Sequence, residues 1–498
     1  MEEGRVQAFP KPEARSRKAI ARLKYDAVQS SPRRRTVYVS SLSEDRELKP
    51  AERQRLSSES RDLMRNFSLA GFAIRKHVQY IADFRFQCQT DNKEFNRLVE
   101  SKIRNWKKRR NCDGARRHCF DVLIQLMEIL RVIDGDVGVL KIDSGLGRIQ
   151  LVEGDRIRSP VEFGGDWSGE DQWIHGVKLG RFGQDVKYAI HKRLDWGGFE
   201  LEREVWSDHL LLCGYYTRAD QIRGVSPLAP VITQFQHLYE GIEYALAKAK
   251  MSQLLGLVTT KVDDTSMMSE RRFDVDEDDE DETASPGLPP TDDDDEVRTE
   301  IREKWGKGIA HLNLDEGEDA KILESSTPST QFQEFVVQVT RMCLAALDIP
   351  YSFYNGERTN FYGSRGDLNN YIGSCQKRQI ALKETLEEIT DWLLRLWVMD
   401  GYLELPDGMT VDDIEYEWRG AGIPYWRLID DSKGLQIAIQ NGFTNPQQVC
   451  MEHGTDYYEN IDEIEIARRY ARGDAQNPRA IPVDVAFATP IETNNIGL

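Results

Sequence analysis

The sequence predicts an α+β fold, in which helices and antiparallel strands occupy separate stretches of the chain. Apolar residues recur at helical spacing over 58–132, and at a spacing of two, which is typical of half-buried strands, over 135–215. Two long helical patterns follow, at 228–255 and 365–399. Because the chain has 498 residues, we expect several packed units rather than one hydrophobic core.

The first 57 residues predict a flexible basic arm. They contain 14 Lys and Arg against eight acids and few large apolar side chains. From Ser58 one helical face is apolar or neutral, and further helices are expected at about 93–110 and 118–132. The residues of the first face are Leu63, Asn66, Phe67, Ala70, Ile74 and Val78.

Alternating runs separated by Gly, Asp and Pro turns predict a compact unit of strands that ends near residue 215. These runs are 137–142, 148–152, 173–179, 186–192 and 209–213.

Ser226, Pro227 and Pro230 then predict the start of a long helix, because proline is favourable in a first helical turn. Its apolar positions, from Val231 to Ala249, alternate in steps of four and three. We expect such a seam to pack against other helices, including copies of itself.

The second half of the chain continues this alternation of long helices and short connections. Strand-like pieces are expected at 309–323 and a helix at about 328–346, before a loop at 350–364 that is rich in Tyr, Asn and Gly. The pattern at 365–399 keeps an apolar seam from Leu368 to Leu396, which we also expect one subunit to leave partly unburied. Short helices follow from about residue 430.

Composition excludes several classes of protein. No run of about 18 apolar residues is present, so neither a transmembrane helix nor a membrane partner is expected, and the N-terminus has no apolar core typical of a secretion signal. Seven dispersed cysteines favour reduced thiols over disulfides or a zinc site. Because the phosphate-binding, nucleophile-elbow and HExxH motifs are absent, we expect no enzyme, catalytic residue, metal or cofactor.

Residues 263–300 hold 17 acids against three arginines, a net charge of −14. Consecutive carboxylates repel one another, so we expect this insert to be solvated and disordered. The alternative is a nucleic-acid-processing enzyme or a packaging ATPase that uses these acids as metal ligands.

The stretch 102–117 is basic and contains Trp106. It could contact nucleic-acid phosphates, although a solvated helix face is the simpler interpretation.

Several short motifs, in order along the chain, resemble the lambda-type portal proteins of tailed bacteriophages. The most informative is the run Gln221–Leu228. Two departures from the family pattern are Asp431, where the family has proline, and Ser364, where it has alanine. The other matching residues include Arg61, Ala70, Ile74, Trp106, Asp113, Asp134, Gly135, Asp136, Asp155, Arg156, Ile157, Tyr362, Arg365, Trp418, Gly420, Ile429, Asp430 and Lys433.

The resemblance implies a portal fold with an α/β wing, long stem helices, a small α/β clip, a long tunnel helix and a helical crown, assembled as a homododecameric ring at one capsid vertex. It further implies double-stranded DNA in the channel, held without sequence specificity. The implied protein partners are the terminase large subunit, the major capsid and scaffold proteins, and head–tail adaptor proteins. Such a protein would be found in the virion, and in the host cytoplasm during assembly. An adaptor of the head–tail joint is a further alternative, but the long stem-like helices disfavour it.

The implied domains follow the predicted elements. They are an arm (1–57), wing (58–227), stem helix (228–255), clip (256–327) with the acidic insert, second stem helix (328–347), tunnel loop (348–364), long helix with return to the wing (365–429), and crown with tail (430–498).

By the same resemblance, the tunnel loop would project into the channel and touch DNA. Arg358 is its only basic group and Glu357 partly offsets it, so contact would be loose. The alternative is a plain connection between helices, packed by its own aromatic side chains. The candidate DNA-contacting residues are Tyr354, Asn355, Arg358, Asn360 and Tyr362.

Overall fold

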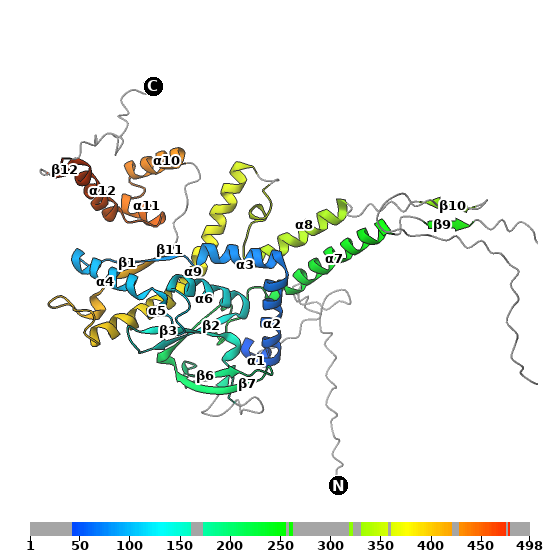
Figure 1. Cartoon of the computed structure of the whole chain (residues 1–498), viewed down its shortest axis with the longest axis horizontal. Coiled ribbons are helices and arrows are strands. Elements are labelled where there is room, and N and C mark those ends of the chain that lie inside the picture. Colours follow the sequence, from blue (N-terminus) through cyan, green and yellow to red (C-terminus); the bar gives the residue numbers. More distant parts are fainter. Residues whose placement is uncertain are drawn as a thin grey trace, which may run out of the picture.

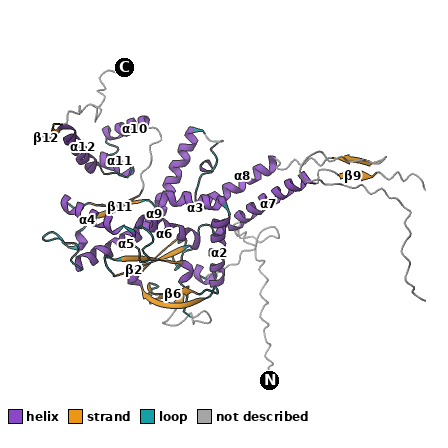
Figure 2. Ribbon diagram, viewed as in Figure 1, coloured by secondary structure: helices purple, strands orange, loops and turns teal. Residues whose placement is uncertain are grey.

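The computed structural model combines helices with small antiparallel sheets, which confirms the mixed helix-and-sheet class (Figures 1 and 2). A compact body contains most of the elements, and a pair of helices extends away from it. The structure describes residues 42–160, 173–254, 258–261, 318–321, 330–356, 360–420, 428–474 and 477–478.

The chain becomes helical earlier than predicted. Helix α1 spans Glu44–Glu47 and α2 spans Pro50–Asn66, so the predicted arm of residues 1–57 ends in helical structure. Pro50 occupies a first helical position, for which its fixed φ is suited. The sequence does not reveal this start because residues 50–57 are mostly polar.

Helix α3 spans Ser68–Ile81, and an extended residue, Phe67 (φ −113°, ψ 111°), separates it from α2. The face predicted from Leu63 to Val78 is therefore divided between two helices that run in different directions (Figure 1). Both contribute to the main core, since Leu63, Ala73 and Ile74 are buried.

The helices predicted at about 93–110 and 118–132 are present. The first is interrupted: α4 spans Lys93–Trp106 and a separate short helix, α5, spans Arg109–Cys112. The second, α6, spans Phe120–Asp134, and nine of its 15 residues are buried.

A three-stranded sheet lies against α6, in the order β3-β2-β8. Its strands are β2 (Asp136–Ile142), β3 (Arg148–Glu153) and β8 (Leu210–Gly214), as the alternating runs predict.

A four-stranded sheet has the order β4-β5-β6-β7. Strand β7 is not predicted, because most of its side chains are exposed and three of them are glutamates. The strands are β4 (Trp173–Ile174), β5 (Val177–Leu179), β6 (Asp185–Arg193) and β7 (Phe199–Trp206).

Two distant segments form a further strand pair. Strand β1 (Phe84–Cys88) pairs antiparallel with β11 (Tyr416–Gly420), and Phe86 lies opposite Trp418. Neither strand is predicted, since each is short and its partner is far away in the sequence.

The predicted long helix after Pro230 is α7 (Ile232–Leu254), preceded by a 3-10 turn, Ala229–Val231. It packs beside α8 (Thr330–Ala345), and this pair extends away from the body in Figure 1. Beyond it, β9 (Val258–Lys261) pairs with β10 (Glu318–Lys321), which lies in the predicted strand-like region 309–323.

Helix α9 spans Phe361–Met399 and is the longest, with 39 residues, or roughly 58 Å at 1.5 Å per residue. Our expectation that one subunit would leave its seam partly unburied is wrong for most of it. Leu368, Leu382 and Ile389 are buried inside the chain, because α3, β8 and β11 pack against this helix.

The C-terminal part is helical, as predicted. It contains α10 (Leu428–Gln440), α11 (Pro446–Glu452) and α12 (Tyr457–Arg472), followed by the two-residue strands β12 (Gly473–Asp474) and β13 (Asn477–Pro478). Short 3-10 turns elsewhere are Gly154–Arg156, Ser207–His209, Tyr351–Phe353 and Val411–Asp413.

Candidate functional site

Three motifs that are far apart in the sequence meet at one buried point. They are the Asp134–Asp136 turn, the Asp155–Ile157 strand end and the Gln221–Leu228 run. Their meeting point is Arg223, which is completely buried. All three motifs stand out in the sequence, but nothing there predicts that they touch.

The guanidinium of Arg223 donates hydrogen bonds in every direction available to it. It binds both carboxylate oxygens of Asp136, each at 2.7 Å. It also donates to the backbone carbonyl oxygens of Ile157 (2.9 Å), Gly154 (2.8 Å) and His175. One side chain therefore joins the start of β2, the turn after β3 and the β4–β5 hairpin.

Two facing glycines allow this close approach. Gly135 adopts a positive φ of 93°, and a Cβ atom there would lie 2.5 Å from the carbonyl oxygen of Gly224. A Cβ atom on Gly224 would lie 2.1 Å from the carbonyl oxygen of Gly135. Any larger residue at either position would separate the two motifs.

The N-terminal helices bind the same point. The carboxylate of Asp45 accepts hydrogen bonds from the backbone N–H groups of Ile222 (2.7 Å) and Arg223 (3.2 Å). Arg53 binds Asp136 at 2.8 Å and the carbonyl oxygen of Gly224 at 2.5 Å. We call Asp45, Arg53, Asp136 and Arg223 the arginine hub.

Electrostatics keep the hub charged. Burial alone would raise the pKa of Asp136, but the positive charges of Arg223 and Arg53 outweigh burial and lower it. Asp136 is therefore ionised at neutral pH, and its two arginine partners balance its charge inside the protein.

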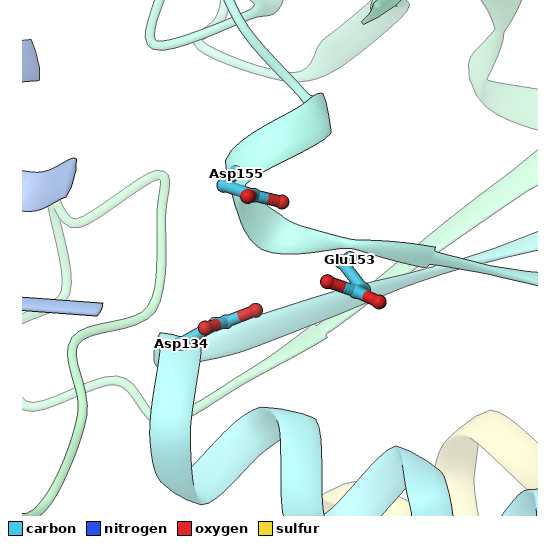
Figure 3. Close-up of side chains that lie close together, drawn as sticks. All are labelled: Asp134, Glu153 and Asp155. Carbon is cyan, nitrogen blue, oxygen red and sulfur yellow. The ribbon is translucent and has the colours of Figure 1, made fainter. Parts of the chain in front are cut away.

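Beside the hub, Asp134, Glu153 and Asp155 form an acidic trio whose carboxylates lie within 4.8 Å of one another (Figure 3). Such a group could hold a metal ion, but two arginines already pair with it. Arg61 binds Asp134 at 2.6 Å and Asp155 at 2.8 Å, and Arg193 binds Asp155 at 2.7 Å. The trio thus joins α2 to the two sheets. The two guanidinium groups neutralise the negative charge that a metal cation would otherwise neutralise.

Asp134 makes this trio sensitive to pH. Burial raises its pKa to about 6 despite the opposing effect of Arg61. The folded pKa exceeds the usual unfolded value, so folding takes up a proton between about pH 4 and 6 and stability falls as pH rises through this window.

We therefore predict that wild-type protein gains about 1 kcal/mol relative to Asp134→Asn when the pH falls from 7 to 5. Denaturant midpoints of both proteins at the two pH values would measure this difference. An equal pH dependence for both proteins would contradict the prediction.

A second buried polar network lies near the first. Tyr215 donates a hydrogen bond to Glu128, and His77 Nε2 lies 3.0 Å from the Tyr215 hydroxyl. Arg131 binds Glu128 at 2.6 Å. Because the His77, Glu128 and Arg131 side chains are at most 1% exposed, a substrate has no access to them, and the network links α3, α6 and the segment after β8.

The structure describes four of the five candidate tunnel-loop residues. Tyr354 packs its ring against Phe72 of α3 at 5.6 Å, and the Asn355 amide donates to the Tyr351 carbonyl. Arg358 lies outside the described residues.

Tyr362 belongs to α9 and Asn360 caps it, so the helix begins before the predicted end of the loop at residue 364. The Asn360 side chain accepts a hydrogen bond from the Gly363 amide at 2.7 Å and caps the helix. Tyr362 lies in the first turn and is 81% exposed. The cap signal at Asn360 is visible in the sequence, but the helical period there is weak.

The start of the predicted loop is anchored. Phe353 packs against Tyr80 and Tyr371, and Ser352 donates a hydrogen bond to Asp367 at 2.6 Å. The packed-connection alternative therefore describes residues 351–354 well.

Other sequence expectations have mixed outcomes. Trp106 of the basic stretch is buried and donates to the Gly147 carbonyl, so it cannot stack on a base. Asp431, a departure from the family pattern, pairs with Arg365 at 2.7 Å.

The acidic run 274–296 lies outside the described residues. Among the helices that the structure describes, none is long and apolar enough to cross a bilayer.

Comparisons with known proteins give a consistent result. The sequence model of the family described as "Phage portal protein, lambda family" matches residues 30–379. The chain is 22% identical over 418 residues to a "Probable portal protein" of Halomonas phage phiHAP-1, covering 80% of this chain and 75% of that protein.

Solved structures with a similar arrangement include two from gene transfer agent (GTA) particles. One is titled "Virion of native gene transfer agent (GTA) particle" (12% identity, TM-score 0.45) and the other "Neck of native GTA particle computed with C12 symmetry" (13% identity, TM-score 0.46). Each comparison covers 80% of this chain and 93% of the other.

Proposed function

The chain belongs to the lambda family of phage portal proteins, and on that premise we propose that it forms a ring at one vertex of a capsid, through which DNA is packaged, retained and ejected. The family match includes the arginine hub and most of the body. As a portal the protein would be a component of the virion, assembled in the host cytoplasm.

We assign the parts of the subunit by their position in the chain. The body from α2 to β8 would be the wing, α7 and α8 the stem, and the β9–β10 pair part of the clip. The first residues of α9 and the segment before it would be the tunnel loop, and α10–α12 the crown.

The observation that carries the ring proposal is the surface of the α7–α8 pair. Five large apolar side chains are exposed along it: Tyr239, Tyr244 and Leu246 on α7, and Phe335 and Met342 on α8. Exposed apolar surface of this kind on a soluble chain is typical of an interface. Because the α9 seam is already buried, this surface and not that seam would hold neighbouring subunits together.

We predict that the double variant Tyr244→Glu, Phe335→Glu forms no rings, because two charges would be buried in the interface. Wild-type protein should sediment near 690 kDa, about twelve times the 57.3 kDa subunit. The variant should sediment as much smaller species, with a circular dichroism spectrum that shows intact helices.

A matched control is Phe182→Glu with Trp196→Glu, which changes two exposed aromatics in turns of the four-stranded sheet. This double variant should still form rings. If the stem variant also forms full rings, the stem assignment is wrong. If wild-type protein stays monomeric over a wide range of concentration and salt, the ring proposal itself is wrong.

We propose the further partners from the family resemblance alone. They are duplex DNA in the channel, the terminase large subunit and adaptors at the clip, and capsid and scaffold proteins around the wing. The enzyme alternative is not favoured, since both the family model and the phage relative are portal proteins. The acidic run on which that alternative rests lies outside the described residues.

A further inference from the structure

The basic stretch at the end of α4, which has no role in the proposed channel, forms an exposed cationic patch. Residues 102–117 contain eight Lys and Arg and a single acid, Asp113. Six of these cations are exposed, and we call them the basic patch: Arg104, Lys108, Arg109, Arg110, Arg116 and Arg117.

The patch has a rigid base. The buried carboxylate of Asp113 accepts hydrogen bonds from the backbone amides of Ala115 (2.9 Å), Arg117 (2.7 Å) and His118 (3.0 Å). The Gly114 amide donates to the Ile149 carbonyl of β3 at 2.9 Å, and Cys112, the last residue of α5, is buried. This scaffold holds Arg116 at a positive φ of 59°, a conformation uncommon for arginine.

The patch has no acidic partner of its own. In the part of the chain that the structure describes, Lys102 is engaged with Tyr402 and Lys107 with Asp121, but none of the six patch residues forms an ion pair. Six like charges within 14 consecutive residues, carried by the end of α4, by α5 and by the turn after it, repel one another, and a bound polyanion would relieve this repulsion.

We propose that the basic patch binds the phosphate backbone of duplex DNA on the outside of the ring, at a site separate from the channel. Five of its six residues are arginines, which bind phosphate oxygens through two N–H groups at once. The aromatic side chains closest to the stretch, Trp106 and Phe120, are buried, so neither can stack on the bases of a single strand. Contact through phosphates alone is independent of sequence.

The position of the patch fits such a role. In Figure 1, α4 and α5 lie at the end of the body opposite to the extended α7–α8 pair. On the proposed stem assignment, this end faces away from the clip. The binding proposal itself does not depend on that assignment, because it rests on the charge and rigidity of the patch.

Covalently closed circular duplex DNA separates the two sites, since a closed circle cannot thread a closed ring. Assembled full-length protein should bind relaxed circles, and log affinity should fall with log salt concentration with a slope of about −5 if all six cations meet phosphates. The variant Arg109→Gln, Arg110→Gln should reduce the steepness of this slope by about 2. Electron microscopy of the same samples would show whether rings are present.

The charge-matched control is Arg181→Gln with Lys192→Gln, two exposed cations on the four-stranded sheet, and it should leave the slope unchanged. Wild-type protein that does not bind circles, or a patch variant with the wild-type slope, overturns the proposal. Tighter, patch-dependent binding of a synthetic peptide of residues 274–296 would mean that the acidic segment of this chain is the ligand instead of DNA. Patch-dependent binding without rings would support the patch and contradict the portal proposal.

Discussion

Replacing Arg223 with methionine is expected to destabilise the protein by about 3–5 kcal/mol, the usual cost of removing one partner of a buried ion pair. The Arg223 and Asp136 side chains have no exposed surface, so solvent cannot compensate for the lost charge. The carbonyl oxygens of Gly154, Ile157 and His175 would also lose a donor. A fall in the thermal unfolding temperature and a loss of soluble yield would measure this effect.

Two further variants test the explanation. Arg55→Met removes an arginine whose pair with Glu59 is on the surface, with Arg55 80% exposed, and should change stability by less than about 0.5 kcal/mol. Arg223→Lys retains the charge but cannot reproduce the bidentate geometry, so it should remain strongly destabilised. If Arg223→Lys is as stable as wild type, the charge alone matters and the hydrogen-bond network does not.

The hub also shows which features of the fold the sequence could predict. Helices α6, α7, α8 and α9 were predictable because each has a sustained apolar period along its sequence. Strands β1 and β11 were not, since each is short and its partner lies over 300 residues away. Strand β7 escaped prediction for a different reason. Its sequence, Phe-Glu-Leu-Glu-Arg-Glu-Val-Trp, does alternate, but four of its eight residues are charged, so the run resembles a polar connection.

For the site, the sequence indicated the motifs but not their relation. Gly135 and Gly224 look like separate turn residues until the structure places each where the other's Cβ would lie. Asp45 and Arg53 lie in the predicted flexible arm, yet both are members of the hub. Long-range ion pairs leave no periodic pattern in a sequence, so only the structure could identify these two residues as part of the site.

The segment between Tyr354 and Asn360 is the part of the predicted tunnel loop that lies between two anchored points. Aromatic packing fixes the chain up to Tyr354, and the helix cap fixes it again from Asn360. Any movement toward DNA would therefore involve residues 355–359 and the exposed Tyr362, a shorter element than the 348–364 loop expected from the sequence.

Deleting residues 355–359 is expected to leave ring assembly intact and to reduce the yield of DNA-filled particles strongly, because functional contacts are often made by connecting loops. Assembly should survive because the deletion spares the α7–α8 surface and the Asn360 cap. Particle DNA content after density-gradient separation would measure packaging, and nuclease protection over time would measure retention.

A Gly/Ser replacement of the same five residues keeps the length of the loop and removes Arg358. If this replacement packages normally while the deletion fails, reach and not chemistry is the requirement. If particles with the deletion fill with DNA and retain it normally, this segment does not contact DNA, although the portal family assignment would still stand.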